Sequence, residues 1–248
     1  MNAETRERKS IFRFACGFEL GIGLVGAALG FLLGPNVWIY LFRGGPSVFE
    51  IGAEVAVGVL AAVPTVLAVW LLMKLPLESV QELKRFGEQP AMQRLLRLDH
   101  ARLLLLSLCS GVGEEIAFRG WLFPWLLEFS KSFTAGDRFL HADLLPLFLA
   151  IAVSSVIFGV VHPHTRLYMV VTALIGVYYA GLLVVSNSLL IPVFAHAAHN
   201  AAQFVMAKRE SERERSEYTA EHDWGVDFLF QDDEDMEADH DDDSQPIA

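Results

Sequence analysis

The chain has 248 residues, of which 53% are hydrophobic, and its mean hydropathy of +0.39 is positive. Several apolar runs approach 20 residues, which is enough to cross a hydrocarbon core about 30 Å thick, so a chain without membrane spans is excluded. The net charge is −11, yet residues 207–248 alone carry −12 and the preceding part sums to +1. The sequence therefore predicts an all-α, polytopic transmembrane helical bundle (residues 1–206) followed by a separate acidic cytosolic tail, with no role for nucleic acid as a partner.

Six transmembrane helices are predicted, at about residues 14–33, 51–73, 103–127, 145–162, 167–185 and 188–206. Their orientation follows from the connecting segments, because cytosolic loops are enriched in Lys and Arg. With the N-terminus in the cytosol, fifteen basic residues fall on the cytosolic side and only three fall outside, namely Arg43, Lys131 and Arg138. This bias predicts an even number of spans and two cytoplasmic termini. The compact size and the lack of a transit peptide favour a prokaryotic plasma membrane.

The segments between and after the spans differ in character. Residues 34–50 and 128–144 are expected to be outside loops, and residues 74–102 predict either an amphipathic connection along the cytosolic surface or an ordinary solvated loop. In the tail, the alternating charges of residues 211–218 can extend the last helix by a few turns. The later tail residues have no apolar pattern and are expected to be disordered. An aromatic island at residues 224–230 is either a docking motif for an unidentified partner or a local cluster without a role.

Ionisable residues inside three of the predicted spans are the most informative feature of the sequence. Such a side chain costs about 2.5–3.5 kcal/mol at the centre of a membrane helix, so these residues are functional candidates. They form the patterns EExxxR, FxxxH and HxxxN, in which residues four apart share a helix face. The residues concerned are Glu114, Glu115 and Arg119, then Phe158 and His162, then His196 and Asn200.

The two adjacent glutamates are expected to have different roles, because neighbouring residues point about 100° apart on a helix. Glu115 precedes Arg119 by four residues, which is the favourable order for an ion pair along a helix. We therefore expect these two residues to form a structural pair. Glu114 is left without a local partner and is free to face the interior of the bundle.

A glutamate, two histidines and an asparagine from three helices suggest hydrolytic chemistry. A buried carboxylate that shares one water molecule with an imidazole can act as a general base on that water. A second imidazole and an amide NH₂ on one helix face are donors that can stabilise a tetrahedral oxyanion. This combination predicts the hydrolysis of a peptide bond. His164 is expected to be a loop residue, and His199 lies close to the face of His196.

The three patterns, in this order on successive apolar helices, resemble those of the CPBP family of intramembrane proteases. This family comprises CAAX-processing and bacteriocin-processing or immunity proteins, the Abi group, and the similarity covers about residues 101–206. The resemblance implies that Glu114 and His162 activate the water and that His196 and Asn200 form the oxyanion hole. It also implies supporting roles: Glu115 and Arg119 beside the glutamate, and Phe158 packed against the site.

Several alternatives stay open at this point. Glu114, His162 and His196 would suit zinc with an open fourth position, although a mechanism without a metal or other cofactor is preferred. The expected partners are membrane lipid and a membrane-associated, possibly prenylated, peptide or protein at the cytosolic face. The competing functions are a non-catalytic membrane adaptor or immunity protein and a proton-coupled transporter, which would also carry ionisable residues at membrane depth.

Overall fold

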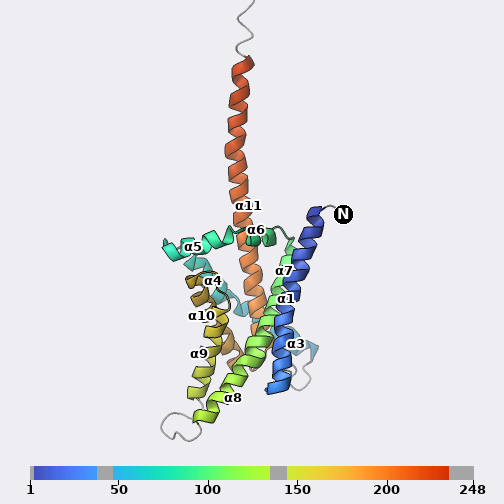
Figure 1. Ribbon diagram of the computed structural model, residues 1–248, viewed down its shortest axis with the longest axis vertical. Coiled ribbons are helices and arrows are strands. Elements are labelled where there is room, and N and C mark those ends of the chain that lie inside the picture. Colours follow the sequence, from blue (N-terminus) through green and yellow to red (C-terminus); the bar gives the residue numbers. More distant parts are fainter. Residues whose placement is uncertain (1–2, 38–46, 135–143, 235–248) are drawn as a thin grey trace, which may run out of the picture. The chain divides into compact units, whose positions relative to one another are not determined.

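The computed structural model describes residues 3–37, 47–134 and 144–234, and these ranges contain helices and no strands. The predicted all-α fold is therefore confirmed for the described part of the chain. The chain divides into two compact units, Met1–Val205 and Met206–Ala248, which are described separately. Within the first unit the helices run in chain order as follows (Figure 1): α1 (Ala3–Leu33), α3 (Val48–Ala61), α4 (Val63–Leu72), α5 (Glu78–Gly87), α6 (Pro90–Leu96), α7 (His100–Glu115), η1 (Ile116–Leu122), α8 (Phe123–Thr134), α9 (Leu144–Val160), α10 (Arg166–Ser186) and the start of α11 (Leu190–Glu234).

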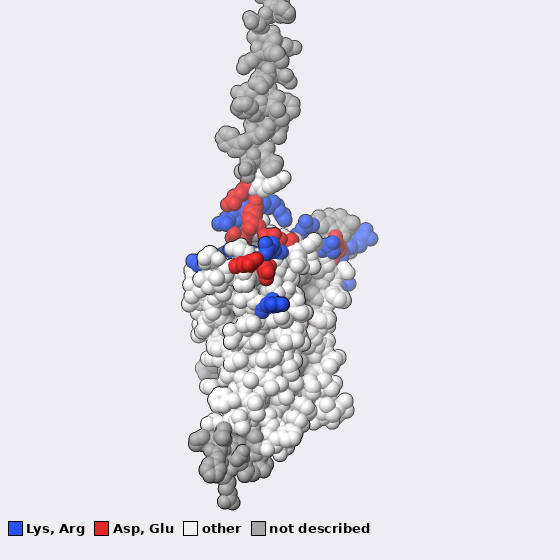
Figure 2. All heavy atoms as spheres, turned by 60° about the vertical axis from the view of Figure 1, so that its left-hand side comes forward, with Lys and Arg blue, Asp and Glu red and all other residues white. Residues whose placement is uncertain are grey.

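Three helical stretches of the described residues are long and apolar enough to cross a membrane: Thr5–Leu33, Val48–Leu72 and Arg166–Ser186. Helix α9 is a further apolar helix of 17 residues. In the view of Figure 2, an uncharged surface covers most of the height of the first unit. The chain is therefore an integral membrane protein, and the count of six spans remains a prediction.

Side-chain caps fix the start of two helices that matter for the site. The carboxylate of Asp99 accepts a hydrogen bond from the backbone N–H of Arg102 at the start of α7. The hydroxyl of Thr165 accepts one from the backbone N–H of Tyr168 at the start of α10. Such caps satisfy backbone donors that have no partner within the helix. Helix α10 ends at Ser186, and its C-cap residue Asn187 has a φ of 56° in the left-handed region.

The connection between α4 and α7 forms two short helices, as the amphipathic alternative for residues 74–102 requires. Helix α5 buries Val80 completely, and Phe86 stacks on His164 with ring centroids 4.2 Å apart. Burial, together with the nearby His162, lowers the pKa of His164. Figure 1 shows α5 and α6 lying across one end of the bundle, close to the start of α1. Helix α5 therefore packs against the turn that follows α9 through Phe86.

Close helix contacts in the first unit depend on glycine. A Cβ on Gly113 of α7 would overlap the backbone carbonyl of Glu19 in α1, and a Cβ on Gly111 would lie 2.7 Å from the carbonyl oxygen of Val193 in α11. Only a residue without a side chain permits such approaches. Helix α7 is thus held between α1 and α11 just before its two glutamates.

The disorder predicted for the tail is not confirmed for residues 207–234, the part of the tail that the structure describes. Helix α11 continues through the first part of the tail and ends at Glu234. Arg213 pairs with Glu210 at 2.8 Å and with Glu217 at 3.6 Å, and charge pairs three and four residues apart favour a helix. Residues 235–248 lie outside the described residues, as do residues 38–46 and 135–143 of the two predicted outside loops.

Candidate active site

The structure brings the predicted site residues together from four segments of the chain. Helix α7 supplies Glu114 and Glu115, and the π-helix η1 that follows it supplies Arg119. Helix α9 ends at Val160, so His162 lies in the turn beyond it. Helix α11 supplies His196 and Asn200. A π-helical turn inside a longer helix is common at functional sites, and here it carries the only cation of the group.

Glu114 is buried, and each of its carboxylate oxygens faces a different neighbour. The Ser110 hydroxyl donates a hydrogen bond of 3.1 Å to Oε1. Oε2 lies 3.5 Å from Nε2 of His162, and it is buried without a donor within hydrogen-bonding distance. A distance of 3.5 Å exceeds the usual length of a direct hydrogen bond. Oε2 and Nε2 therefore form a polar pair to which a third polar group, such as a water molecule, can bond.

The orientation of His162 is set by the helix that precedes it. Its Nδ1 lies 2.6 Å from the backbone carbonyl oxygen of Phe158. A carbonyl only accepts hydrogen bonds, so Nδ1 carries the proton and donates it. In the neutral ring, Nε2 then presents a lone pair toward Glu114.

Glu115 and Arg119 form a buried ion pair with 2.9 Å between Oε1 and Nη1. They are 0% and 1% exposed, respectively. Nη2 of Arg119 donates to the backbone carbonyl of Gly176 at 3.1 Å, so the pair also fastens η1 to α10. The sequence did not reveal a second partner: Nδ1 of His196 lies 2.9 Å from the same Oε1 of Glu115. Glu115 therefore orients His196 as well as neutralising Arg119.

Phe158 packs among the polar groups of the site. The Arg119 guanidinium lies 4.2 Å from the centre of its ring, which is within the range of a cation–π interaction. The rings of His162 and His196 meet Phe158 edge to face at centroid distances of 4.9 and 6.0 Å. Its side chain therefore separates and positions the two histidines.

Asn200 reaches the site through a serine that the sequence patterns did not include. Its Nδ2 donates to Ser110 Oγ at 3.1 Å, and the same hydroxyl donates to Glu114. The sequence does contain a feature that indicates this serine: Ser110 lies four residues before Glu114, on the same helix face. His199 turns away from the site, since its Nδ1 bonds to Thr65 Oγ1 of α4 at 2.9 Å.

Glu19 of α1 is a second site residue that the sequence patterns missed. Its carboxyl group is within hydrogen-bonding reach of Glu114 and is close enough to interact electrostatically with His162 and His196. Its Oε2 is buried without a donor partner. The sequence signal was a glutamate inside an apolar span, yet nothing in the sequence indicates which helices α1 contacts.

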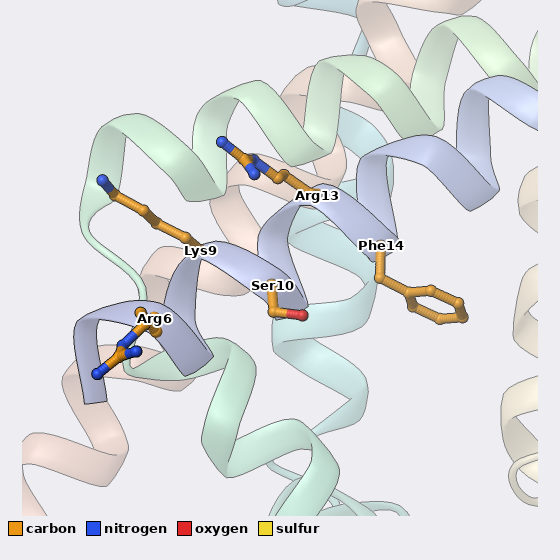
Figure 3. A pocket seen from close by; sticks show the side chains of 5 residues that line it. All are labelled: Arg6, Lys9, Ser10, Arg13 and Phe14. Atoms are coloured by element: carbon orange, nitrogen blue, oxygen red, sulfur yellow. The ribbon is translucent and has the colours of Figure 1, made fainter. Parts of the chain in front are cut away.

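Two hollows lie on the first unit. An apolar groove of about 660 Å³ runs between α1, η1 and α9, and its lining includes Phe18, Val25, Phe118 and Trp121. Phe118 meets Phe158 edge to face at 4.9 Å, so one residue of the groove lining contacts a residue of the site. The second hollow, of about 480 Å³, lies at the start of α1 and is lined by Arg6, Lys9, Ser10, Arg13 and Phe14 (Figure 3). It contains none of the site residues, and its basic character agrees with the cytosolic position predicted for this end.

The comparison with protein families identifies the segment that carries this geometry. Residues 97–202 match the family described as type II CAAX prenyl endopeptidase Rce1-like. This segment is similar to an Rce1-like domain. It includes α7, η1, α9, α10 and the first turns of α11, and therefore every residue of the three patterns, whereas Glu19 lies before it. No curated protein and no solved structure matches the chain.

The Rce1-like domain agrees with the resemblance to the CPBP family. At the level of the family it implies an intramembrane endopeptidase whose substrate is a membrane-associated peptide. Over residues 97–202 the chain is thus similar to membrane-bound hydrolases of the CAAX protease type.

The ionisable residues of the site do not form a metal-binding cluster. Within the described ranges, no group of three or more His, Cys, Asp or Glu side chains is arranged to hold one. Glu114 faces His162, whereas His196 directs Nδ1 at Glu115. The side chains of Glu114, His162 and His196 therefore do not converge on one point where a metal ion could bind.

Proposed function

We propose that the protein hydrolyses a peptide bond with a water molecule activated by Glu114 and His162. The observation that carries this proposal is the buried Oε2 of Glu114 at 3.5 Å from Nε2 of His162, without a donor of its own. A carboxylate oxygen and an imidazole lone pair are both acceptors, so a water molecule that bonds to both offers its two protons. Its oxygen is then free to attack a carbonyl carbon while Glu114 takes up one proton.

The oxyanion of the tetrahedral intermediate is stabilised by His196 and Asn200 from α11. Glu115 holds Nδ1 of His196, so Nε2 of that ring is available on the opposite side, where it donates when it is protonated. The amide of Asn200 offers a second donor, and its bond to Ser110 keeps it beside Glu114. The breakdown of the intermediate transfers the proton from Glu114 to the leaving amine.

The substrate is a lipidated or otherwise apolar peptide of the CAAX type that is cleaved near the cytosolic face. The groove between α1, η1 and α9 supports this assignment, because its lining is apolar and Phe118 in that lining contacts Phe158. In this proposal the protein crosses a prokaryotic plasma membrane six times and has both termini in the cytoplasm. The substrate reaches the site from the membrane.

The test is hydrolysis of a farnesylated CAAX-type peptide that carries a fluorophore and a quencher on opposite sides of the scissile bond. Glu114→Gln keeps the shape of the side chain and removes the base, so turnover is expected to fall about 10²- to 10⁴-fold. Asn200→Ala removes one donor and is expected to lower turnover about 10²- to 10³-fold. Both variants should elute from size-exclusion chromatography as the unmodified protein does. Equal turnover by Glu114→Gln and the unmodified protein would refute the mechanism.

The same assay tests the metal-free mechanism. Enzyme that has been exhaustively dialysed against a chelator is expected to keep its turnover. Loss of activity on chelation, followed by recovery with zinc, would assign the glutamate to a metal instead.

A further inference from the structure

Glu19 lies on α1, outside the matched Rce1-like segment, and still reaches the candidate site. Helices α1 and α7 approach so closely that a Cβ on Gly113 would overlap the backbone carbonyl of Glu19, and a Cβ on Gly23 would lie 2.8 Å from Cα of Gly113. Gly113 directly precedes Glu114 in α7. The backbone contact therefore places Glu19 on the facing helix, beside the residue that precedes Glu114.

The two carboxyl groups face each other within the bundle. They are within hydrogen-bonding reach, and Oε2 of each is buried without a donor from any other residue. Two carboxylates offer only acceptors, so they can bond to each other only when one of them carries a proton. A single shared proton removes the repulsion between two negative charges at close range, and it leaves a second lone pair on Oε2 of Glu114 for the water.

We propose that Glu19 is a positioning residue for the general base, and that its protonated carboxyl group donates a hydrogen bond to the carboxylate of Glu114. This inference rests on the proposed function of Glu114. Ser110 already donates to Oε1 of Glu114, so Glu19 supplies a donor from a second helix. With a donor on each side, the carboxylate keeps one oxygen directed at Nε2 of His162.

A second carboxyl group in the same membrane protein gives a matched control. Glu54 of α3 also lies in an apolar stretch long enough to cross the membrane, but its Oε2 accepts a hydrogen bond of 2.8 Å from Ser188. Removing Glu54 therefore removes a comparable glutamate without touching the donors of Glu114.

The experiment compares Glu19→Gln, Glu19→Leu, Glu54→Leu and Glu114→Gln with the farnesylated fluorogenic peptide. The amide of Glu19→Gln still donates to Glu114, so kcat is expected to stay close to that of the unmodified protein. Glu19→Leu keeps an apolar side chain in the span but loses the donor, and kcat is expected to fall about 10- to 100-fold, the scale of one hydrogen bond to a charged group, with little change in KM. Glu54→Leu is expected to leave kcat unchanged.

Infrared spectroscopy gives a readout that does not depend on turnover. The unmodified protein is expected to show the C=O stretch of a protonated carboxyl group, which Glu19→Gln removes and Glu54→Gln retains. A band that persists in Glu19→Gln would overturn the shared proton. Full turnover by Glu19→Leu, beside an inactive Glu114→Gln, would overturn the positioning role and leave the proposed function intact. Full turnover by Glu114→Gln would refute the proposed function, and the infrared result would still decide whether the two carboxyl groups share a proton.

Discussion

Replacing Arg119 tests how far the buried ion pair determines the stability of the bundle. Arg119 and Glu115 are 1% and 0% exposed, and their charged atoms are 2.9 Å apart. Without the arginine, Glu115 keeps only His196 as an ionisable partner. Breaking a buried pair from one side costs about 3–5 kcal/mol, and loss of the cation contact on Phe158, at 4.2 Å, adds up to about 2 kcal/mol.

The variants Arg119→Met and Glu115→Gln with Arg119→Met separate the lost charge from the lost packing. The single variant is expected to lower the free energy of unfolding by about 3–7 kcal/mol, the sum of both contributions. The double variant should recover part of that loss, because it leaves no unpaired glutamate. Unfolding in mixed detergent micelles with increasing dodecyl sulfate, followed by tryptophan fluorescence, measures both values.

An exposed arginine provides the control. Arg213 pairs with Glu210 at 2.8 Å, but the two side chains are 63% and 57% exposed. Arg213→Met is therefore expected to change the free energy of unfolding by at most about 1 kcal/mol. The reasoning is wrong if Arg119→Met unfolds at the same denaturant concentration as the unmodified protein. A stable but inactive Arg119→Met would instead give Arg119 a direct part in the reaction.

Three further predictions follow from the packing and the charge distribution. Gly113→Ala should lower the free energy of unfolding by about 1–3 kcal/mol, because the added Cβ overpacks against α1. Gly21→Ala should leave it unchanged, because no atom lies within 4 Å of the added Cβ. Equal stability of the two variants would contradict the described helix contact. A chain that ends at Arg215 should cleave the fluorogenic peptide as fast as the full chain, since every residue of the proposed site precedes that point, and loss of cleavage would show that the tail contributes to the site. In a variant whose two native cysteines are replaced, Glu212→Cys should react with a membrane-impermeant maleimide only in inverted vesicles, so labelling of intact cells would reverse the predicted orientation.

The sequence determined those features that depend on spacing along one helix. The ion pair between Glu115 and Arg119 could be predicted because residues four apart on a helix must be neighbours. The cost of ionisable residues in apolar helices marked the residues of the three patterns as functional candidates, and the resemblance of those patterns to known proteases suggested the family. The all-α fold followed for a related reason, because a membrane-spanning helix satisfies every backbone donor and acceptor internally.

The tail shows how the order of charges supports a helix. The alternating charges of residues 211–218 allowed the last helix to extend, and the charges around Arg213 pair along a helix in α11, which continues to Glu234. The disorder expected for the later tail residues falls mostly on residues 235–248, which lie outside the described residues. Composition reports the lack of an apolar core, whereas helix formation here depends on the order of the charges.

Only the tertiary structure decided which side chains meet across helices. Glu19 lies beside Gly113 because glycines bring α1 and α7 together, His196 shares Glu115 with Arg119, and Asn200 reaches the base through Ser110. Each of these contacts depends on which helices are neighbours and on how each is rotated about its axis. The packing of small residues determines which helices are neighbours and how each is rotated. The periodicity of residues along one helix contains no information about either.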